Sequence, residues 1–308
     1  MNEGGSSLSY PLPDEPPARS KTAWWRALAG CLLLAAALAK VDLTSLLSRL
    51  SQLQARYLLL GAALTIPQLY WLALRWRYTA RALGLPLTRR EALREYSASF
   101  LLNQLLPLGI MGDGLRIARQ ARKHATWSRA LHSVLLERAL GQAVLLLCVL
   151  AVLPLWLSAQ HVWLVLAACA LIWLALVLLR AHSPQLALLT GALAQLVATR
   201  RQLGKILGLS TLILFSIAVQ LYCALWSIDL TLSPLTAAKV FPLLLLSMSI
   251  PISFAGFGPR EAAAATLFSA MQLSRADGVA FAVAFGTLLL CSTIPSLCMA
   301  WWFSRAED

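Results

Sequence analysis

The run at residues 206–228, ILGLSTLILFSIAVQLYCALWSI, contains no Asp, Glu, Lys or Arg. A helix rises about 1.5 Å per residue, so about 20 apolar residues are enough to cross the hydrocarbon core of a bilayer. In the whole chain of 308 residues, 59% are hydrophobic and only 13% are charged, whereas about a quarter of an average soluble domain is charged. The sequence therefore predicts an all-α integral membrane protein.

Five further apolar runs bring the predicted number of full spans to about six. They lie at residues 23–39, 57–74, 139–161, 162–179 and 278–303. Amphipathic surface helices are expected at 42–56 and 181–202. Residues 1–21, rich in Pro, Gly and Ser, are expected to form a disordered cytoplasmic tail, and 304–308 a second short tail.

Two other apolar runs are interrupted and do not read as ordinary spans. The first contains PLGIMGD at residues 107–113, and the second contains PISFAGFGPRE at 251–261. Pro and Gly break helices, and in lipid a broken backbone is tolerated only where protein or a cavity surrounds it. Both runs are therefore predicted to be re-entrant hairpins, and the protein would have seven to eight spans if either crosses fully.

The two interrupted runs resemble each other. Each has an apolar helix, a break rich in Pro and Gly, and a new helix that opens with charged residues. Each is flanked by spans, so the two would enter the membrane from opposite sides. This order predicts an inverted repeat with halves at about 57–157 and 206–303, and paired interruptions of this kind point to a transporter's binding site.

The positive charge is concentrated in one part of the chain. Twelve of the 26 Lys and Arg lie between residues 75 and 138. The span at 57–74 is expected to end in a loop that carries Arg75. The positive-inside rule makes this loop cytoplasmic and places both termini on the same side of the plasma (inner) membrane. This rule accounts for the net charge of +13, so nucleic-acid binding is not predicted.

The tryptophans at predicted helix ends are expected to form an aromatic belt: Trp24, Trp25, Trp71, Trp76, Trp301 and Trp302.

The first interruption suits the binding of an anionic headgroup. A helix that begins at residue 113 or 114 would present unpaired N–H groups and the positive end of its dipole at the break. Gly109 and Gly112 would let a ligand approach the backbone, and Arg116 lies one turn into the helix. The alternative is that Asp113 merely caps the helix and pairs with Arg116.

The second interruption has a similar set of residues. Gly258 is a plausible N-cap and Pro259 suits the first helical turn. Ionisable residues between long apolar runs are costly and are functional candidates, although a structural salt bridge is the alternative. The candidate substrate-binding residues here are Ser253, Gly256, Gly258, Arg260 and Glu261.

Three polar residues outside the breaks are assigned supporting roles. Asn103, just before the first break, could hydrogen-bond the freed backbone or a substrate. Glu137 and Arg138, expected to begin the third span, are candidates for structural ion pairs with an arginine of either hairpin.

No catalytic constellation is found in the sequence. There is no GxxxxGK[ST] loop, no HExxH, no paired-Cys motif and no Ser/His/Asp set. The six cysteines all lie in apolar runs, where they read as small apolar fillers. No enzyme activity, cofactor or metal site is therefore predicted.

The ordered motifs resemble the flippase-like membrane region of lysylphosphatidylglycerol synthases. They are Leu74-Arg75-Trp76-Arg77, Asn103 to Pro107, Gly112-Asp113-x-x-Arg116, and Pro251-Ile252-Ser253 to Gly256-x-Gly258-x-Arg260-Glu261. The resemblance covers residues 22–303 and implies a lipid-translocating domain. Pro259 stands where the family often has Val. The aminoacyl-transferring domain of the full synthases is not among these 308 residues, so the resemblance does not imply synthase activity.

The expected function is translocation of a lipid between leaflets, with a membrane phospholipid as the partner. The lipid would be an anionic or aminoacylated phospholipid, or one with a similar lipid-linked headgroup. One alternative is a membrane glycosyltransferase or lipid-modifying enzyme that uses a polyprenyl-phosphate donor, with Asp113 or Glu261 as base. Another is a non-transporting partner of a separate lipid synthase, and a homo-oligomer is also compatible with the sequence.

Overall fold

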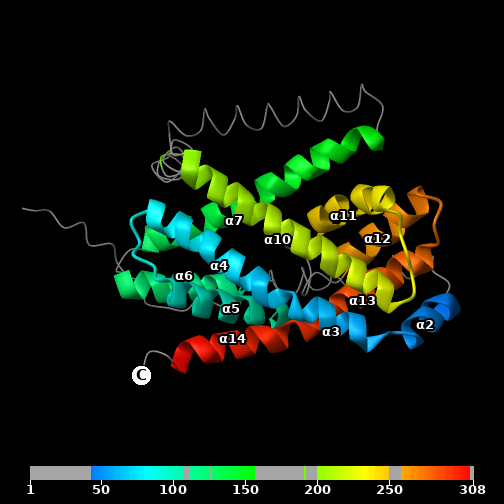
Figure 1. Cartoon of the computed structure of the whole chain (residues 1–308), viewed down its shortest axis with the longest axis horizontal. Helices are drawn as coiled ribbons and strands as arrows, with labels where there is room; N and C mark the ends of the chain where they lie inside the picture. Colours follow the sequence, from blue (N-terminus) through cyan, green and yellow to red (C-terminus); the bar gives the residue numbers. More distant parts are fainter. Residues whose placement is uncertain are drawn as a thin grey trace, which may run out of the picture.

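The computed structural model describes residues 43–106, 111–124, 127–156, 191, 200–249 and 258–305. Within these ranges every regular element is a helix and there is no strand. The helices are α2 (Leu43–Ser51), α3 (Ala55–Ala63), α4 (Thr65–Ala82), α5 (Arg89–Leu105), α6 (Met111–His124), α7 (Trp127–Val152), the 3-10 turn η1 (Leu153–Leu155), α10 (Arg200–Ser227), α11 (Pro234–Met248), α12 (Pro259–Ala270), α13 (Arg275–Cys291) and α14 (Thr293–Arg305) (Figure 1).

Four helical segments are long and apolar enough to cross a membrane, and each coincides with a predicted span. They are Ala55–Ala82, Trp127–Leu155, Arg200–Ser227 and Arg275–Arg305. The shortest of them have 28 residues, which corresponds to about 42 Å of helix and exceeds the roughly 30 Å of a hydrocarbon core. The helical membrane fold is thus confirmed for the described residues. The predicted spans at 23–39 and 162–179 and the tail at 1–21 lie outside them.

The helices continue past the charges that were expected to end them. α4 runs through Arg75 to Ala82, and α7 starts at Trp127 and carries Glu137 in its interior. The prediction that Arg75 lies in a loop and that Glu137 begins a span was wrong. The two charges neutralise each other across the helices, with Arg75 Nη2 2.6 Å from Glu137 Oε1, so neither has to leave the apolar environment.

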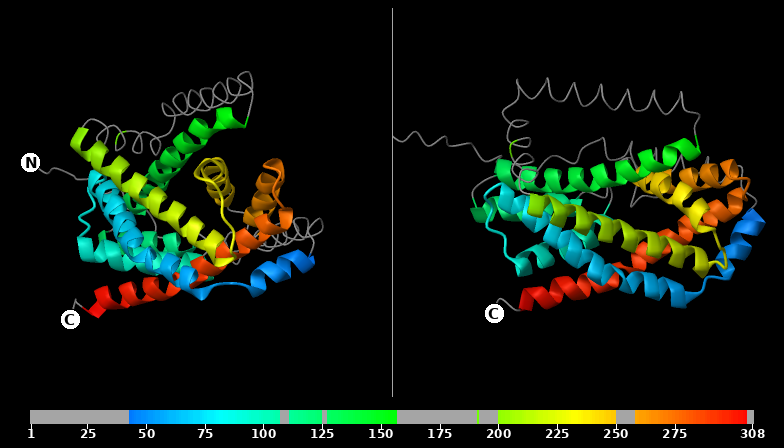
Figure 2. Two further views of the ribbon diagram at one scale, coloured as in Figure 1. Left: turned by 45° about the vertical axis from the view of Figure 1, so that its right-hand side comes forward. Right: turned by 45° about the horizontal axis from the view of Figure 1, so that its top comes forward.

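The two interrupted runs form two pairs of helices. α5 and α6 contact each other along the first run, and α11 and α12 along the second. The pairs lie toward opposite ends of the molecule's long axis, and the broken ends of both point toward its middle (Figures 1 and 2). Residues 107–110 and 250–257, which connect the members of each pair, lie outside the described residues.

The starts of the two post-break helices follow different local signals. α12 begins at Pro259 with Gly258 as N-cap, as the sequence predicted. Gly258 has a φ of 97°, a conformation that side-chain-bearing residues rarely adopt. α6 begins at Met111 rather than at residue 113 or 114, so Asp113 lies within its first turn.

The segment Arg275–Arg305 links the two pairs, because α13 contacts α12 and α14 contacts α5. α10 contacts α3 and α4, and the Gln220 amide donates to the carbonyl of Gly61 at 3.0 Å and to Thr65 at 3.1 Å. α14 packs along α5, where the Ser296 hydroxyl donates to the Ser97 carbonyl at 2.7 Å. These buried polar contacts fix the helix register where apolar packing alone is not directional.

The surface helix expected at 42–56 is shorter than predicted. α2 ends at Ser51, residues 52–54 are not helical, and α3 begins at Ala55. α2 contacts α13, to which the Arg49 guanidinium is joined by a 2.9 Å ion pair with Asp277. Of the second surface helix, expected at 181–202, only residues 191 and 200–202 are described, and Arg200 opens α10.

Candidate functional site

Five charged residues from three helices form one connected network, which we call the charge cluster. Its members are Arg75 on α4, Asp113 and Arg116 on α6, and Glu137 and Arg138 on α7. Arg75 donates from Nε and Nη2 to Glu137 Oε1 at 3.0 and 2.6 Å, and from Nη1 to the Ser210 hydroxyl at 3.2 Å. The Tyr96 hydroxyl lies 3.3 Å from the same carboxylate oxygen. This end of the cluster is a closed, well-hydrogen-bonded ion pair.

Asp113 binds the other two arginines. Its Oδ1 accepts from Arg116 Nη2 at 2.9 Å and from the Ser99 hydroxyl at 3.1 Å. Its Oδ2 is paired with Arg138 Nη2. Arg116 Nη2 also lies 3.6 Å from Glu137 Oε2, so a single chain of ion pairs runs through all five residues. Both carboxylates therefore have partners on each of their oxygens.

Arg116 is enclosed by protein. Its guanidinium lies over the rings of Trp76 and Tyr96, with centroid distances of 4.4 and 4.5 Å. Cation–π contacts of this kind are strongest away from water. Trp76 is fully buried, so its expected place in an aromatic belt was wrong: it covers a buried charge instead of meeting the lipid headgroups.

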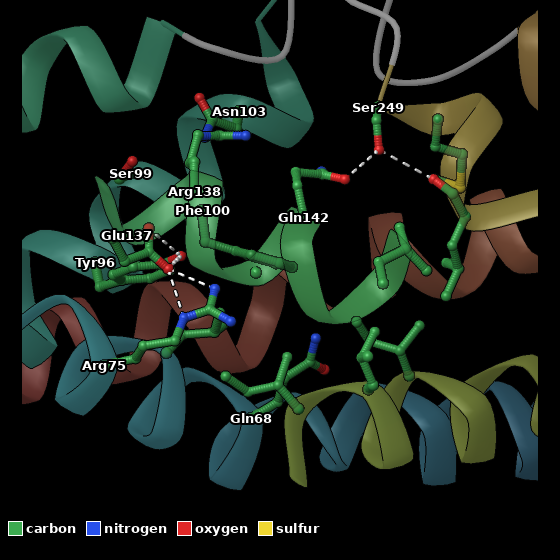
Figure 3. A pocket seen from close by; sticks show the side chains of 18 of the residues that line it. Gln68, Arg75, Tyr96, Ser99, Phe100, Asn103, Glu137, Arg138, Gln142 and Ser249 are labelled. Carbon is green, nitrogen blue, oxygen red and sulfur yellow. Dashed lines mark hydrogen bonds and ion pairs between the residues drawn. The ribbon is translucent and has the colours of Figure 1, made fainter. Parts of the chain in front are cut away.

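A cavity of about 360 Å³ lies beside the charge cluster. One part of its wall is polar, from α4, α5, α6 and α7, and the other is apolar, mainly from α10 and α11. Figure 3 shows Arg75, Tyr96 and Glu137 gathered at one side, with Gln142 and Ser249 at another. The polar lining residues are Gln68, Arg75, Tyr96, Ser99, Asn103, Gln104, Asp113, Glu137, Arg138, Gln142 and Ser249; the apolar ones include Leu72, Phe100, Leu145, Ile213, Leu214, Ile217, Leu245, Met248 and Leu289.

The three arginines of the cluster differ in their access to this cavity. The Arg138 side chain is 47% exposed, compared with 7% for Arg75 and 1% for Arg116. Arg138 and Arg75 line the cavity, whereas Arg116 does not. Arg138 is thus the cluster cation best placed to meet a ligand, although the sequence suggested it only as a structural pairing residue.

The predicted residues of the first hairpin have separate roles. Asn103 Oδ1 accepts from the backbone N–H of Gly112 at 2.8 Å, so it satisfies a donor freed at the helix start. A Cβ on Gly112 would lie 2.1 Å from the carbonyl oxygen of Ser99, so Gly112 allows α5 and α6 to pack closely. Gly109 lies outside the described residues.

The predicted residues of the second hairpin are buried away from the cavity. Arg260 donates from Nε and Nη2 to Glu261 Oε1 at 3.0 and 2.7 Å, and Glu261 Oε2 accepts from the Gly258 N–H at 2.6 Å. A Cβ on Gly286 of α13 would come within 2.3 Å of the Arg260 guanidinium. None of these residues lines the cavity. Ser253 and Gly256 lie outside the described residues.

The polar cavity-lining residues that sequence reasoning missed include Gln68, Arg75, Tyr96, Ser99, Gln142 and Ser249. A helical-spacing signal was present, because polar residues seven apart lie on one helix face. Gln68 and Arg75 have this spacing on α4, and so do Tyr96 and Asn103 on α5. In the described ranges no three His, Cys, Asp or Glu side chains lie together as metal ligands.

The comparison with known families decides the assignment. The family described as the lysylphosphatidylglycerol synthase TM region matches residues 23–294. The chain belongs to this family. The resemblance drawn from the motifs is therefore confirmed, and every residue that lines the cavity falls within the matched range. Membership of the lysylphosphatidylglycerol synthase TM family indicates a lipid-related role in a membrane. No curated protein and no solved structure matches the chain.

Proposed function

We propose that this protein translocates a lipid with an anionic headgroup between the two leaflets of a membrane. The observation that carries the proposal is the two-sided wall of the cavity. A lipid has a polar headgroup and apolar acyl chains, which match the two parts of the wall. The headgroup can contact the charge cluster, and the acyl chains can contact the leucines and isoleucines of α10 and α11. Family membership supports a lipid as the ligand.

The proposed mechanism is an exchange of partners at Arg138. In the described structure Arg138 is paired with Asp113. A phosphate oxygen that enters the cavity competes for the exposed guanidinium, to which it can bind in a bidentate manner. Asp113 then keeps its contact with Arg116 at 2.9 Å, so no carboxylate is left unpaired. The headgroup is thereby held between leaflets without a large desolvation cost.

The arrangement of the helix pairs supports an inverted repeat as the framework for this exchange. α5–α6 and α11–α12 approach the middle of the molecule from opposite ends (Figure 1), as expected if one re-entrant hairpin enters from each side. We propose about six full spans, cytoplasmic termini and location in the plasma (inner) membrane. Alternating opening of the two pairs would expose the cavity first to one leaflet and then to the other.

Reconstitution in liposomes tests the proposal. A phospholipid labelled on its acyl chain is incorporated in both leaflets, and the fraction quenched by a membrane-impermeant reductant is followed with time. We expect the wild-type protein to make inner-leaflet lipid accessible, and Arg138→Ala to lose most of this activity. Arg119→Ala is the matched control. Arg119 is also about half exposed, at 49%, and also pairs with a carboxylate, Glu95, but it does not line the cavity.

Three outcomes separate the candidate functions. Accessibility no higher than in empty vesicles, with wild-type protein shown to be folded and inserted, would exclude translocation. Equal loss in the Arg138 and Arg119 variants would show that the effect is not specific to the cavity. Copurification of the folded, inactive protein with a lipid synthase would favour the non-transporting partner instead.

A further inference from the structure

We infer the class of headgroup that the cavity selects: a phosphodiester with one net negative charge whose remaining groups are neutral hydroxyls, in preference to a headgroup that carries an amine. This inference rests on the proposed function. It is carried by the charge balance of the cluster and by the unpaired amide oxygen of Gln68 in the cavity wall.

The charge cluster has one positive charge in excess. Three arginines are paired with two carboxylates, and all of these residues except Arg116 line the cavity. No other Asp, Glu, Lys or Arg among the described residues lines it. The connecting segments at 107–110 and 250–257 contain no ionisable residue. A buried excess charge is costly unless a counter-charge is supplied. A phosphodiester, which carries a single negative charge, supplies it.

The charge cluster has no free carboxylate with which a positively charged group of the ligand could pair. Glu137 is occupied by Arg75, Arg116 and the Tyr96 hydroxyl. Asp113 is occupied by Arg116, Arg138 and Ser99. An ammonium group on the ligand would have to displace an arginine, and the displaced arginine would then repel it. Like charges brought together in such a site cost several kcal/mol.

Neutral hydrogen-bonding groups make up much of the remaining polar wall. Gln68 is only 6% exposed, and its Oε1 has no hydrogen-bond partner among the described residues. Gln104 and Gln142 line the same cavity. An orphaned buried acceptor calls for a donor. A hydroxyl group can donate to the Gln68 oxygen while it accepts from an amide N–H, which suits a glycerol or sugar headgroup.

The experiment compares three lipids that are labelled identically on the acyl chain and differ only in headgroup. Phosphoglycerol carries one negative charge, phosphoethanolamine is zwitterionic, and lysyl-phosphoglycerol has a net positive charge. We expect wild-type translocation to be fastest for phosphoglycerol and at least about tenfold slower for the lysyl lipid, because 1.4 kcal/mol already corresponds to a factor of ten. Equal rates, or a faster rate for either amine-bearing lipid, would overturn the inference while leaving translocation intact.

A substitution that cancels the excess charge provides the second arm. Gln142→Glu keeps the acceptor that receives the Ser249 hydroxyl at 3.1 Å and adds one negative charge to the cavity wall. We expect it to shift the preference from phosphoglycerol toward phosphoethanolamine by about tenfold. Gln202→Glu, the same change at an exposed position of α10 outside the cavity, is the matched control and is expected to leave the order unchanged.

The outcomes of this arm are distinguishable from failure of the proposed function. If the wild-type protein in vesicles translocates none of the three lipids, both the proposed function and this inference are refuted. If the wild type translocates lipid but both glutamate variants leave the headgroup order unchanged, only the inference fails. Should Gln142→Glu not fold, Gln104→Glu adds the same negative charge at another position of the cavity wall and must shift the headgroup preference in the same direction.

Discussion

Replacing Glu137 by glutamine removes the negative charge at the centre of the charge cluster while preserving the side chain's shape. The carboxylate is fully buried and receives Arg75 at 2.6 Å and Arg116 at 3.6 Å. The variant leaves three arginines with Asp113 as their only carboxylate in the cluster. Breaking a buried ion pair from one side costs about 3–5 kcal/mol, because the remaining charge has no partner. We expect Glu137→Gln to destabilise the fold by that amount.

The Arg75 and Glu137 pair also allows a double-mutant cycle. Arg75→Gln combined with Glu137→Gln removes both charges, so the double variant should be more stable than the sum of the single costs predicts, by about 2–3 kcal/mol. Asp277→Asn is the control for a loss of charge elsewhere. Its ion pair with Arg49 is partly exposed, and such a pair contributes no more than about 1 kcal/mol.

The measurement is unfolding in detergent micelles by titration with a denaturing detergent, followed through the fluorescence of the 11 tryptophans. A cost below about 1 kcal/mol for Glu137→Gln, or single costs that simply add, would refute the view that this network is buried and mutually dependent.

Three further predictions concern the space around two glycines and the solvent exposure of two arginines. Gly112→Ala should lower the melting temperature because its Cβ would lie 2.1 Å from a backbone carbonyl, whereas Gly114→Ala, with nothing within 4 Å, should not. Gly286→Ala should cost about 1–3 kcal/mol in the same denaturant titration because the buried guanidinium facing it has to move; a neutral result would show that this guanidinium is mobile. In a cysteine-free background, Arg138→Cys should react with a water-soluble thiol reagent much faster than Arg116→Cys, in line with their exposures of 47% and 1%; equal rates would contradict the assignment of Arg138 to the cavity.

Local sequence signals predicted much of the membrane architecture. The uncharged runs located all four long helices that the structure describes, because hydrophobic length is a property of a continuous segment. The start of α12 was predicted for the same reason: Gly258 and Pro259 act within a single helical turn.

Pairing between distant residues could not be read from one chain. Arg75 was placed in a loop because a charge normally ends a span, but its partner Glu137 is 62 residues away. Arg116 was expected to face a ligand, yet Trp76 and Tyr96 from two other helices enclose it. Both errors arise because a charge can be buried only where the tertiary fold places a partner or an aromatic ring beside it. Neither the spacing of residues nor the composition of the chain indicates which distant residues will be neighbours.

The separation of Arg75 from Glu137 has a consequence for how the protein is made. An arginine at the centre of an isolated apolar helix opposes insertion by about 2.5–3.5 kcal/mol. The carboxylate that neutralises Arg75 is 62 residues further along the chain, which a ribosome adding about 5–20 residues per second supplies roughly 3–12 s later. The carboxylate that pairs with Arg75 is therefore absent while α4 is being synthesised, and we expect insertion of α4 to become more favourable once α7 is available.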